Sequence, residues 1–387
     1  MVDDGSTDGT GEILKRERTG TGMTIDIIRS IRGMEQIEGE WNRLAEVTKH
    51  PLLQFDWFHA CARTLHAETD FRIATFSRGG RIAAIAPLCL DRGLEGRLTL
   101  LGVSILGEPS GLLYEDPHAL DSLILGLSGL RQPILLLRVP AEASLAGRFR
   151  ADESRCGSIV VERRGAGSAA VPIQGTWMEF LEALPGKRRY DLRRARRRAE
   201  EAGKLEIRTL FCPPSGDIDR YLDTAFRVEA SGWKGRRGSS ILQNKRLARF
   251  FRLYCTVAAV AGHLRLSFLE VDGQAIATQI GVEFGGRYWI LKIGYDEKWS
   301  KCSPGMQLMM ESTRYAFEQG LEALEFLGSD EEWLRVWPLV HRSYDVVGVY
   351  PWNPRGFYCV VMDFGRSISG RYRRIREIEP PKSSSGE

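Results

Sequence analysis

The sequence predicts an α/β (α+β) protein made of two tandem modules with mixed sheets. One observation is a hairpin pattern that occurs twice, with Gly79-Gly80 between apolar runs in the first half and Asp272-Gly273 in the second. The other is the stretch from Gly286 to Asp330, which reads as strand, loop, helix and strand. A repeated order of elements indicates two related modules.

Composition narrows the class of protein. The chain has 387 residues, of which 43% are hydrophobic and 27% charged, enough for roughly two or three domains with substantial cores. No apolar run reaches the ~20 residues that span a bilayer, and the first residues are acidic and polar. The seven cysteines lack CxxC spacing and indicate buried thiols. We therefore expect a cytoplasmic protein without a metal site.

Residues 1–22 do not match the rest of the chain. Val2 to Thr10 reads VDDGSTDGT, which resembles the nucleotide-sugar motif of inverting family-2 glycosyltransferases. That motif needs a preceding strand and a full sheet, and no strand precedes it here. We expect residues 1–22 to lie outside the domains as a fusion remnant or an over-extended start, with Met23 as the true beginning; a flexible arm rich in Gly, Ser and Thr is the alternative.

The first module is expected over residues 23–172. Its predicted elements are strand Thr24–Ile28, helices Met34–Val47 and Trp57–Leu65, strands Phe71–Ser77, Arg81–Leu90 and Arg97–Leu101, helix Ala119–Leu130 and strand Ile134–Val139. It lacks a clear loop-and-helix unit like that at 297–319, so we expect it to be degenerate.

The second module is expected over residues 173–365 and repeats this order. Its predicted elements are helix Trp177–Leu184, a basic helix from Lys187, strand Leu205–Leu210, helices Ile218–Ala230 and Asn244–Val260, and strands Leu264–Val271, Gln274–Phe284 and Tyr288–Asp296. Residues 366–387 form a basic tail whose end is expected to be disordered.

The stretch from Gly286 to Asp330 is a candidate anion site. Apolar residues from Met306 to Phe317 recur at helical spacing, and Gly320 stands where a helix C-cap favours a positive φ. The start of a helix at the end of a strand offers free N–H groups and a positive dipole end to phosphate. The alternative is an ordinary crossover that packs a helix on a sheet.

A second charged feature is the helix expected at Lys187–Arg198, which carries eight basic residues in twelve against the single acid Asp191. A solvated charged face is one interpretation. An anionic partner is the other: CoA phosphates, tRNA or an acidic membrane surface. No DNA-binding is expected.

Several motifs together resemble a known family. They are Glu229-Ala230-Ser231-Gly232-Trp233-Lys234-Gly235, the Asp272-Gly273 hairpin, Gly294-Tyr295-Asp296, Ser303-Pro304-Gly305-Met306-Gln307-Leu308, and Gly328-Ser329-Asp330 with Trp337. Over residues 23–365 the chain resembles the CelD (cellulose biosynthesis) type of GNAT-like acetyltransferase, which is related to the Fem aminoacyltransferases. The resemblance implies two tandem GNAT-like modules, the second holding acyl-CoA between two parallel strands that part.

The resemblance also implies donor-site residues. Ile293, Gly294 and Tyr295 would line the pantetheine arm of acetyl-CoA or another acyl-CoA. The residues that would offer loop and helix amides to phosphate are Ser303, Gly305, Met306 and Gln307. The usual signature begins with a basic residue or Gln and has Gly at two later positions, where this chain reads Ser300, Ser303 and Gly305. Lys298 or Lys301 would therefore supply positive charge.

Acyl transfer needs a base, a proton donor and a positioned acceptor. Glu229 is the candidate base, with Asp296 or Asp330 as alternatives, and Tyr295 could protonate the leaving thiolate. The aromatic and basic residues Trp233, Lys234, Trp333 and Trp337 are candidates for binding the acceptor. Each also has a structural interpretation, as a helix-end carboxylate or a packed aromatic ring.

The expected function is acyl-CoA-dependent N- or O-acyl transfer to a sugar or amine acceptor in envelope or exopolysaccharide metabolism. Expected partners are acyl-CoA, the acceptor and polysaccharide-synthesis proteins, with peripheral contact to the inner face of the membrane left open. Two alternatives remain: an aminoacyl-tRNA-dependent, Fem-like transferase, and a non-catalytic GNAT-fold assembly factor.

Overall fold

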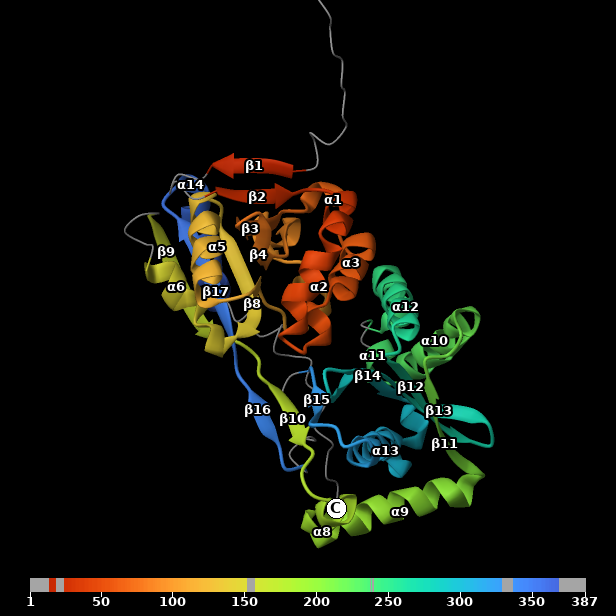
Figure 1. Ribbon diagram of the computed structural model, residues 1–387. Helices are drawn as coiled ribbons and strands as arrows, with labels where there is room; N and C mark the ends of the chain where they lie inside the picture. Colours follow the sequence, from red (N-terminus) through yellow and green to blue (C-terminus); the bar gives the residue numbers. More distant parts are fainter. Residues whose placement is uncertain are drawn as a thin grey trace, which may run out of the picture. The chain divides into compact units, whose positions relative to one another are not determined.

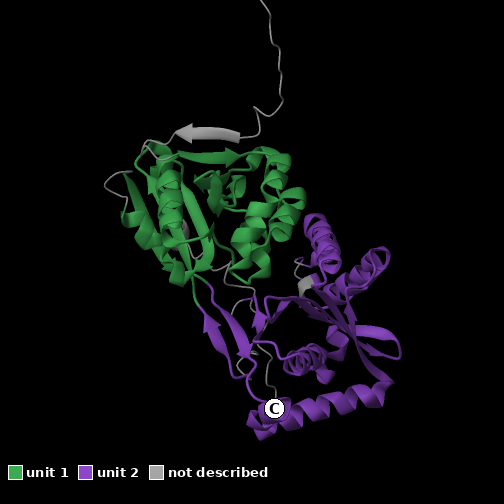
Figure 2. Cartoon of the chain, viewed as in Figure 1, with its two compact units in different colours: residues 1–165, 343–373 green, residues 166–342, 374–387 purple. Residues whose placement is uncertain are grey.

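The computed structural model describes residues 14–18, 24–151, 157–236, 238, 240–328 and 337–368. These residues divide into two units, shown in different colours in Figure 2. The described residues up to Gly165 and from Ser343 make up the first unit, and Ala166–Arg342 make up the second.

The first unit is built from two separate parts of the sequence, one that precedes the second unit and one that follows it. Its elements are β1 (Leu14–Arg18), β2 (Thr24–Ile28), α1 (Ile31–Gln36), α2 (Glu38–Glu46), η1 (Pro51–Leu53), α3 (Phe55–Thr64), η2 (Glu68–Asp70), β3 (Ile73–Arg78), β4 (Arg81–Ala86), β5 (Leu88–Asp91), η3 (Arg92–Leu94), β6 (Arg97–Leu100), α4 (Val103–Leu106), β7 (Leu113–Tyr114), α5 (Pro117–Gly129), β8 (Ile134–Pro140), η4 (Ala141–Ala143), α6 (Leu145–Ala151), β9 (Ser158–Arg164), β17 (Tyr344–Pro351) and α14 (Pro354–Ile368).

The second unit is continuous in sequence. Its elements are β10 (Ser168–Pro172), α8 (Trp177–Ala183), α9 (Gly186–Ala202), β11 (Leu205–Phe211), α10 (Ser215–Ala230), α11 (Trp233–Arg236), η5 (Ile241–Gln243), α12 (Lys245–Val260), β12 (Leu264–Val271), β13 (Gln274–Phe284), β14 (Arg287–Tyr295), η6 (Glu297–Cys302), α13 (Pro304–Glu318), β15 (Ala323–Phe326) and β16 (Val340–Arg342). Figure 1 shows α10 and α12 on one side of this unit's sheet and α13 on the other.

The two units share a strand order. The second has one sheet, β11-β12-β13-β14-β15-β10-β16, in which β14 and β15 are parallel. The first has two sheets, β1-β2-β3-β4-β7 and β5-β6-β8-β17-β9, and only Pro87 separates β4 from β5. Reading through β4 and β5 as one bent strand gives β2-β3-β4/β5-β6-β8-β17-β9, which is the same order apart from the additional β1 and β7, with parallel β6 and β8 in place of β14 and β15. The mixed-sheet, two-module architecture expected from the sequence is confirmed.

The hairpin turns follow from their residues. Gly79 and Gly80 have φ of 60° and 79°, Asp272 and Gly273 have 49° and 77°, and Gly285 and Gly286 have 61° and 75°. Two successive residues in the left-handed region twist a two-residue turn to match the strands that it joins. The pairs Arg78↔Arg81, Val271↔Gln274 and Phe284↔Arg287 close these hairpins as expected.

The module boundaries differ from those expected. β10 pairs with β15 and β16, so it lies in the second unit, although the sequence predicted it in the first module. β17 pairs with β8 and β9, so it returns to the first unit, whereas it was expected in the second module. β1 pairs with β2, although Leu14–Arg18 was expected outside the domains. Long-range pairing decides these boundaries; the rest of the basic tail, after Ile368, lies outside the described residues.

A buried ion pair holds α14 to the first unit. The side chain of Arg97 is fully buried, and its Nη1 donates to Asp363 Oδ2 at 2.6 Å. Arg97 also donates to Glu95 and to the carbonyl of Cys359, and Tyr350 donates to Asp363. A buried charge is stable only with such partners, so these contacts define the position of the helix.

Candidate active site

β14 and β15 lie side by side for only part of their length. Their parallel pairing runs from Arg287↔Ala323 to Ile290↔Phe326, where β15 ends, while β14 continues to Tyr295 along β13. At the point of parting the β13–β14 register shifts: Gly281 pairs with Ile290 and Ile280 with Lys292, which leaves one extra residue on β14. Such a bulge changes the direction of a strand. The second unit therefore has a sheet that opens between two parallel strands.

The far half of β14 contacts a different helix on each face. A Cβ built on Gly294 would lie 2.7 Å from Cα of Glu229, so the end of α10 packs directly on Gly294. A Cβ on Gly305, in the first turn of α13, would lie 3.4 Å from Tyr295 Cδ1 and 3.8 Å from Ile293 Cδ1. Alternate residues of a strand face opposite sides. Glu229 and the side chain of Tyr295 are thus brought to the same strand end on opposite faces.

The connection from β14 to α13 presents a helix start at this opening. The Asp296 carboxylate accepts from the N–H of Lys298 at 3.0 Å and begins η6. Ser303, exposed and at φ 45°, then turns the chain into α13 without a side-chain cap. Gly305 and Met306 are in the first turn, where a helix supplies no carbonyl for their N–H groups. These amides are suited to an anion.

Gln307 has a different role from the one expected. Its backbone N–H donates to the Ser303 carbonyl at 3.1 Å, so that amide is already used within the turn. Its buried side chain donates from Nε2 to the Cys302 carbonyl at 2.7 Å, and its Oε1 has no hydrogen-bond partner in the described structure. Gln307 therefore shapes the turn.

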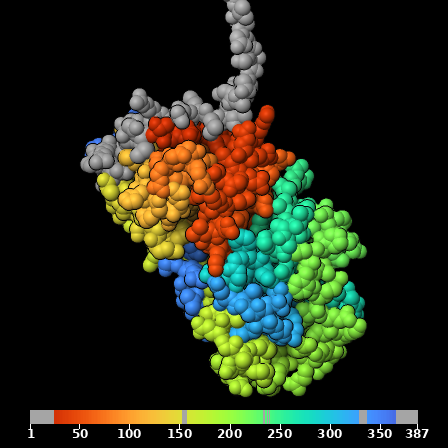
Figure 3. All heavy atoms as spheres, in the orientation of Figure 1, coloured from red at the N-terminus to blue at the C-terminus, as the bar shows by residue number. Residues whose placement is uncertain are grey.

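Arg198 brings positive charge to this connection. Its Nη1 donates to the carbonyl of Lys301 at 3.2 Å, which ties α9 to η6. Burial raises the pKa of the neighbouring Cys302 thiol, and the Arg198 charge opposes that rise. Lys298 and Lys301 are exposed on the same connection. Figure 3 shows the blue atoms of the α13 region at the surface of the second unit beside the yellow-green atoms of its first helices.

Glu229 is buried, and its carboxylate accepts a hydrogen bond. Its Oε2 accepts from the N–H of Ile241 at 3.0 Å, so the carboxylate anchors η5 next to the end of α10. Glu229 packs against β14 at Gly294, so it lies beside the opening between β14 and β15. The same carboxylate can thus hold a loop and face the end of β14.

The expected acceptor motif forms a tight turn after α10. A Cβ on Gly235 would lie 1.8 Å from the Ala230 carbonyl, so that position needs glycine, and one on Gly232 would lie 3.0 Å from the Tyr295 carbonyl, a tight contact. Trp233 and Lys234 begin α11, but their side chains lie outside the described structure. Arg236 Nη2 donates to Glu297 Oε1 at 2.8 Å and joins α11 to η6.

Trp337 is a core residue. It is buried, and its ring stacks on Phe180 with centroids 5.6 Å apart. The apolar contacts of its ring are therefore made inside the second unit, and the expected contact of Trp337 with an acceptor stays a prediction. The other two residues expected near this loop, Asp330 and Trp333, lie outside the described residues.

In the first unit, the gap between β6 and β8 is filled by another segment of the same unit, Glu108 to Leu113. β6 and β8 pair in parallel only at Leu98↔Ile134. Farther along β8, the carbonyl of Arg138 accepts from the N–H of Ser110, and the whole segment from Glu108 to Leu113 is buried.

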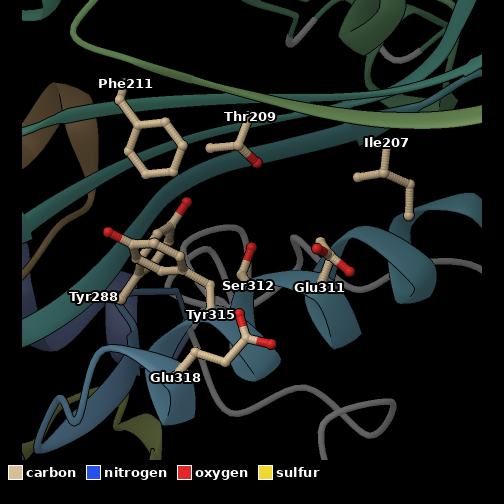
Figure 4. Close-up of a pocket in the computed structure, with 8 residues that line it drawn as sticks. All are labelled: Ile207, Thr209, Phe211, Tyr288, Glu311, Ser312, Tyr315 and Glu318. Atoms are coloured by element: carbon tan, nitrogen blue, oxygen red, sulfur yellow. The ribbon is translucent and has the colours of Figure 1, made fainter.

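A separate hollow lies at the opposite end of β14, near Tyr288 (Figure 4). Its lining comes from β11, β14 and α13: Ile207, Thr209, Phe211, Tyr288, Glu311, Ser312, Tyr315 and Glu318. The charged side chains of this lining are both acidic, which disfavours phosphate. We therefore do not assign it to the acyl donor.

Within the described residues no group of three or more His, Cys, Asp or Glu side chains is placed to hold a metal ion. In the same part of the chain, no helix has both the length and the apolar character needed to cross a bilayer.

Comparison with known proteins agrees with this geometry. Residues 186–335 match the family model described as acetyltransferase (GNAT) domain. This match and the parting parallel strands identify the second unit as a GNAT-type acyltransferase domain. No curated protein matches the chain in sequence.

Two solved structures share the fold over most of the chain. One is the C-terminal domain of a protein from Agrobacterium fabrum that is described as a lysylphosphatidylglycerol synthetase, with 12% identity and a TM-score of 0.51 over 86% of this chain and 96% of that one. The other is FemX, with 11% identity and a TM-score of 0.52 over 80% and 95% of the two chains.

The family resemblance indicated the β14 and α13 residues but not Arg198 individually. In the sequence the basic helix appears unrelated to the loop before α13, because Arg198 and Lys301 are far apart along the chain. Only the packing of α9 on η6 distinguishes Arg198 from the other arginines.

Proposed function

We propose that the second unit transfers an acyl group from acyl-CoA, acetyl-CoA being the simplest donor, to an amine or hydroxyl of an acceptor. The observation that carries this proposal is that β14 parts from β15 directly beside the first turn of α13. An extended acyl-pantetheine arm fits beside a strand end, and its diphosphate suits a helix N-terminus.

The donor-site roles follow the geometry. Ile293, Gly294 and Tyr295 would line the pantetheine arm along the far half of β14. The amides of Gly305 and Met306, with Ser303 before them, would receive the diphosphate. Arg198 and Lys301 would supply the positive charge that the loop sequence itself lacks at Ser300. The first unit would not bind a donor, because its own buried segment holds the corresponding position.

The proposed chemistry needs no covalent enzyme intermediate. The acceptor nitrogen or oxygen attacks the thioester carbonyl, the C–S bond breaks, and Glu229 receives the acceptor proton. Tyr295 would protonate the leaving thiolate. Asp296 is a weaker alternative base because its carboxylate caps η6, and Asp330 stays an alternative outside the described residues.

The acceptor class is proposed from the family resemblance. A sugar or amine of envelope or exopolysaccharide metabolism fits the CelD-like motifs, with polysaccharide-synthesis proteins as partners and the cytoplasm as the compartment. The Gly232–Gly235 turn would border the acceptor through Trp233 and Lys234.

The direct test is a titration of the purified protein with acetyl-CoA and longer acyl-CoAs, read by thermal shift. A ligand that binds only the folded state raises the melting temperature, and about 100 times its Kd adds roughly 2.7 kcal/mol. We expect a concentration-dependent rise with acyl-CoA. Unchanged melting at millimolar acyl-CoA would overturn the proposal.

One observation favours a second candidate, an aminoacyl-tRNA-dependent transferase. Arginines 193, 194, 196 and 197 of α9 are exposed and present a basic surface next to η6. Reversal of these four charges should abolish tRNA binding in a gel-shift assay if tRNA is the donor carrier. An acyl-CoA enzyme should keep most of its turnover in the same variant.

A further inference from the structure

The hollow near Tyr288 lies within the second unit and is separate from the donor opening (Figure 4). Its volume is about 160 Å³, below the roughly 300–1,000 Å³ of sites for drug-sized ligands, so an occupant must be small. Tyr288 is near the start of β14 and Tyr295 is at its end, roughly 20 Å away along the strand. The occupant of this hollow is therefore not the acceptor of the proposed acyl transfer.

Aromatic rings form one side of the hollow, as Figure 4 shows. The ring centroids of Phe211 and Tyr315 are 5.5 Å apart, and those of Tyr315 and Tyr288 are 6.1 Å apart. The Tyr315 ring is held in place because its hydroxyl donates to Glu283 Oε2 at 2.6 Å. The guanidinium carbon of Arg265 already lies 5.2 Å from the Phe211 centroid. Ring faces attract cations, so this side of the hollow favours a positively charged ligand.

The charge of the lining comes from α13. Glu311 and Glu318 are two turns apart on one face of this helix. Arg314 Nη2 donates to Glu311, and Arg314 Nη1 is 3.7 Å from Glu318 Oε1. The charge of Arg265 is matched by Glu283, whose Oε2 is 3.0 Å from Arg265 Nη2. One cation between two carboxylates leaves a net negative charge at the hollow.

The hydroxyl of Tyr288 is a second observation, independent of charge. Tyr288 is 1% exposed and lines the hollow. Apart from weak contacts with Ser267 and Ser312, its hydroxyl has no hydrogen-bond partner in the described structure. Burying a hydroxyl without a partner is unfavourable, and a polar group of a ligand would supply one.

We propose that this hollow binds a small organic ammonium ion. Glu311 and Glu318 balance its charge, and the rings of Phe211 and Tyr315 contact its carbon atoms. The hydroxyl of Tyr288 forms a hydrogen bond with a hydroxyl or N–H group of the ligand. A phosphate would be repelled by the two carboxylates, and a purely apolar molecule would leave the Tyr288 hydroxyl without a partner. The site is independent of the proposed acyl transfer.

The test is calorimetric titration of the full-length protein with choline and with the neutral analogue of choline in which carbon replaces nitrogen. We expect saturable binding of choline and binding of the analogue that is at least about tenfold weaker, because only choline is charged. Glu311→Gln should raise the Kd for choline by about 5–30-fold. Arg314→Gln should lower the Kd instead, because it removes a cation that competes for the same carboxylates. Tyr288→Phe should raise it by about fivefold through the lost hydrogen bond.

Glu206→Gln is the matched control. It removes an equal charge from an exposed position on the opposite face of β11 and should bind choline as the wild type does. Equal affinity for choline and its neutral analogue, or no binding at millimolar choline, would overturn the proposal. Weaker binding by both Glu311→Gln and Arg314→Gln would also overturn it, since charge then does not decide affinity. Acetyl-CoA binding should be unchanged in all these variants, so failure here leaves the acyl-transfer proposal standing.

Discussion

Glu229 and Gly294 are in direct contact: a Cβ added to Gly294 would lie 2.7 Å from the Glu229 Cα and 2.9 Å from its Cβ. The absence of a side chain at one position of β14 lets the end of α10 approach the strand. The same approach fixes the place of the carboxylate. A side chain at Gly294 would therefore disturb both the packing of α10 on β14 and the position of the proposed catalytic carboxylate.

This contact predicts the effect of Gly294→Ala. The new methyl group would meet backbone of α10, so the helix end must move, with an expected loss of about 1–3 kcal/mol in the free energy of unfolding. Activity should fall further, because Glu229 moves with the helix. Urea unfolding and acyl transfer measure the two effects. Gly216→Ala, in the same helix with nothing within 4 Å, is the control and should not lose stability.

Glu229→Gln separates the two roles of that side chain. A glutamine oxygen can still accept from the N–H of Ile241, so the folded structure should persist. If Glu229 is the base, kcat should fall by about 10²–10⁴-fold, the usual contribution of proton transfer. Melting temperature and steady-state kinetics are the measurements. Near wild-type kcat in a fully folded variant would assign Glu229 an anchoring role only.

Arg198→Ala should weaken donor binding. Arg198 lies against the connection that leads into α13, so losing its charge should raise the Kd for acetyl-CoA by about 5–30-fold. Calorimetric titration measures the change, and Arg198→Lys should recover part of the affinity. Arg193→Ala on the same helix removes an equal charge from an exposed position and is the matched control. Equal losses in the two alanine variants would contradict a specific role for Arg198.

Tyr288 predicts a loss of stability at alkaline pH. Its hydroxyl is buried without a hydrogen-bond partner in the described structure, and burial raises its pKa to about 12. The unfolded chain loses this proton near the ordinary value of about 10, so between about pH 10 and 12 the folded state binds more protons. Stability therefore falls as pH rises through that range, by about 2 kcal/mol for this group.

The variant Tyr288→Phe removes that contribution. Its free energy of unfolding at neutral pH should stay within about 1 kcal/mol of the wild-type value, since the hydroxyl makes only weak contacts with Ser267 and Ser312. Urea unfolding at a series of pH values should show a shallower decline between about pH 10 and 12 than in the wild type. Parallel declines would show that Tyr288 titrates normally.

Asp363→Ala should destabilise the first unit strongly. It leaves the fully buried Arg97 without its 2.6 Å partner, a change that costs about 3–5 kcal/mol for buried pairs. The double variant Arg97→Met, Asp363→Leu removes both charges and should recover much of this loss. Denaturant unfolding compares the three proteins. A single variant as stable as the wild type would show that Glu95 and the Cys359 carbonyl suffice for Arg97.

Local sequence patterns determined much of this protein by themselves. Paired glycines and Asp272-Gly273 predicted the hairpin turns, because few residues adopt a positive φ. Apolar spacing predicted the elements at 286–330, and the family resemblance assigned Ile293, Gly294, Tyr295, Gly305 and Met306 to a donor site within them. These features depend on residues that are close together in the sequence, so local patterns are enough to predict them.

Only the tertiary structure decided which distant residues meet. It placed Trp337 in a core against Phe180 and brought Arg198 to Lys301. It also returned β17 and α14 to the first unit, where Asp363 pairs with Arg97 and the aromatic face of α14 is left outward. Such contacts join residues about a hundred or more positions apart through side-chain packing and strand pairing, and no local periodicity records them.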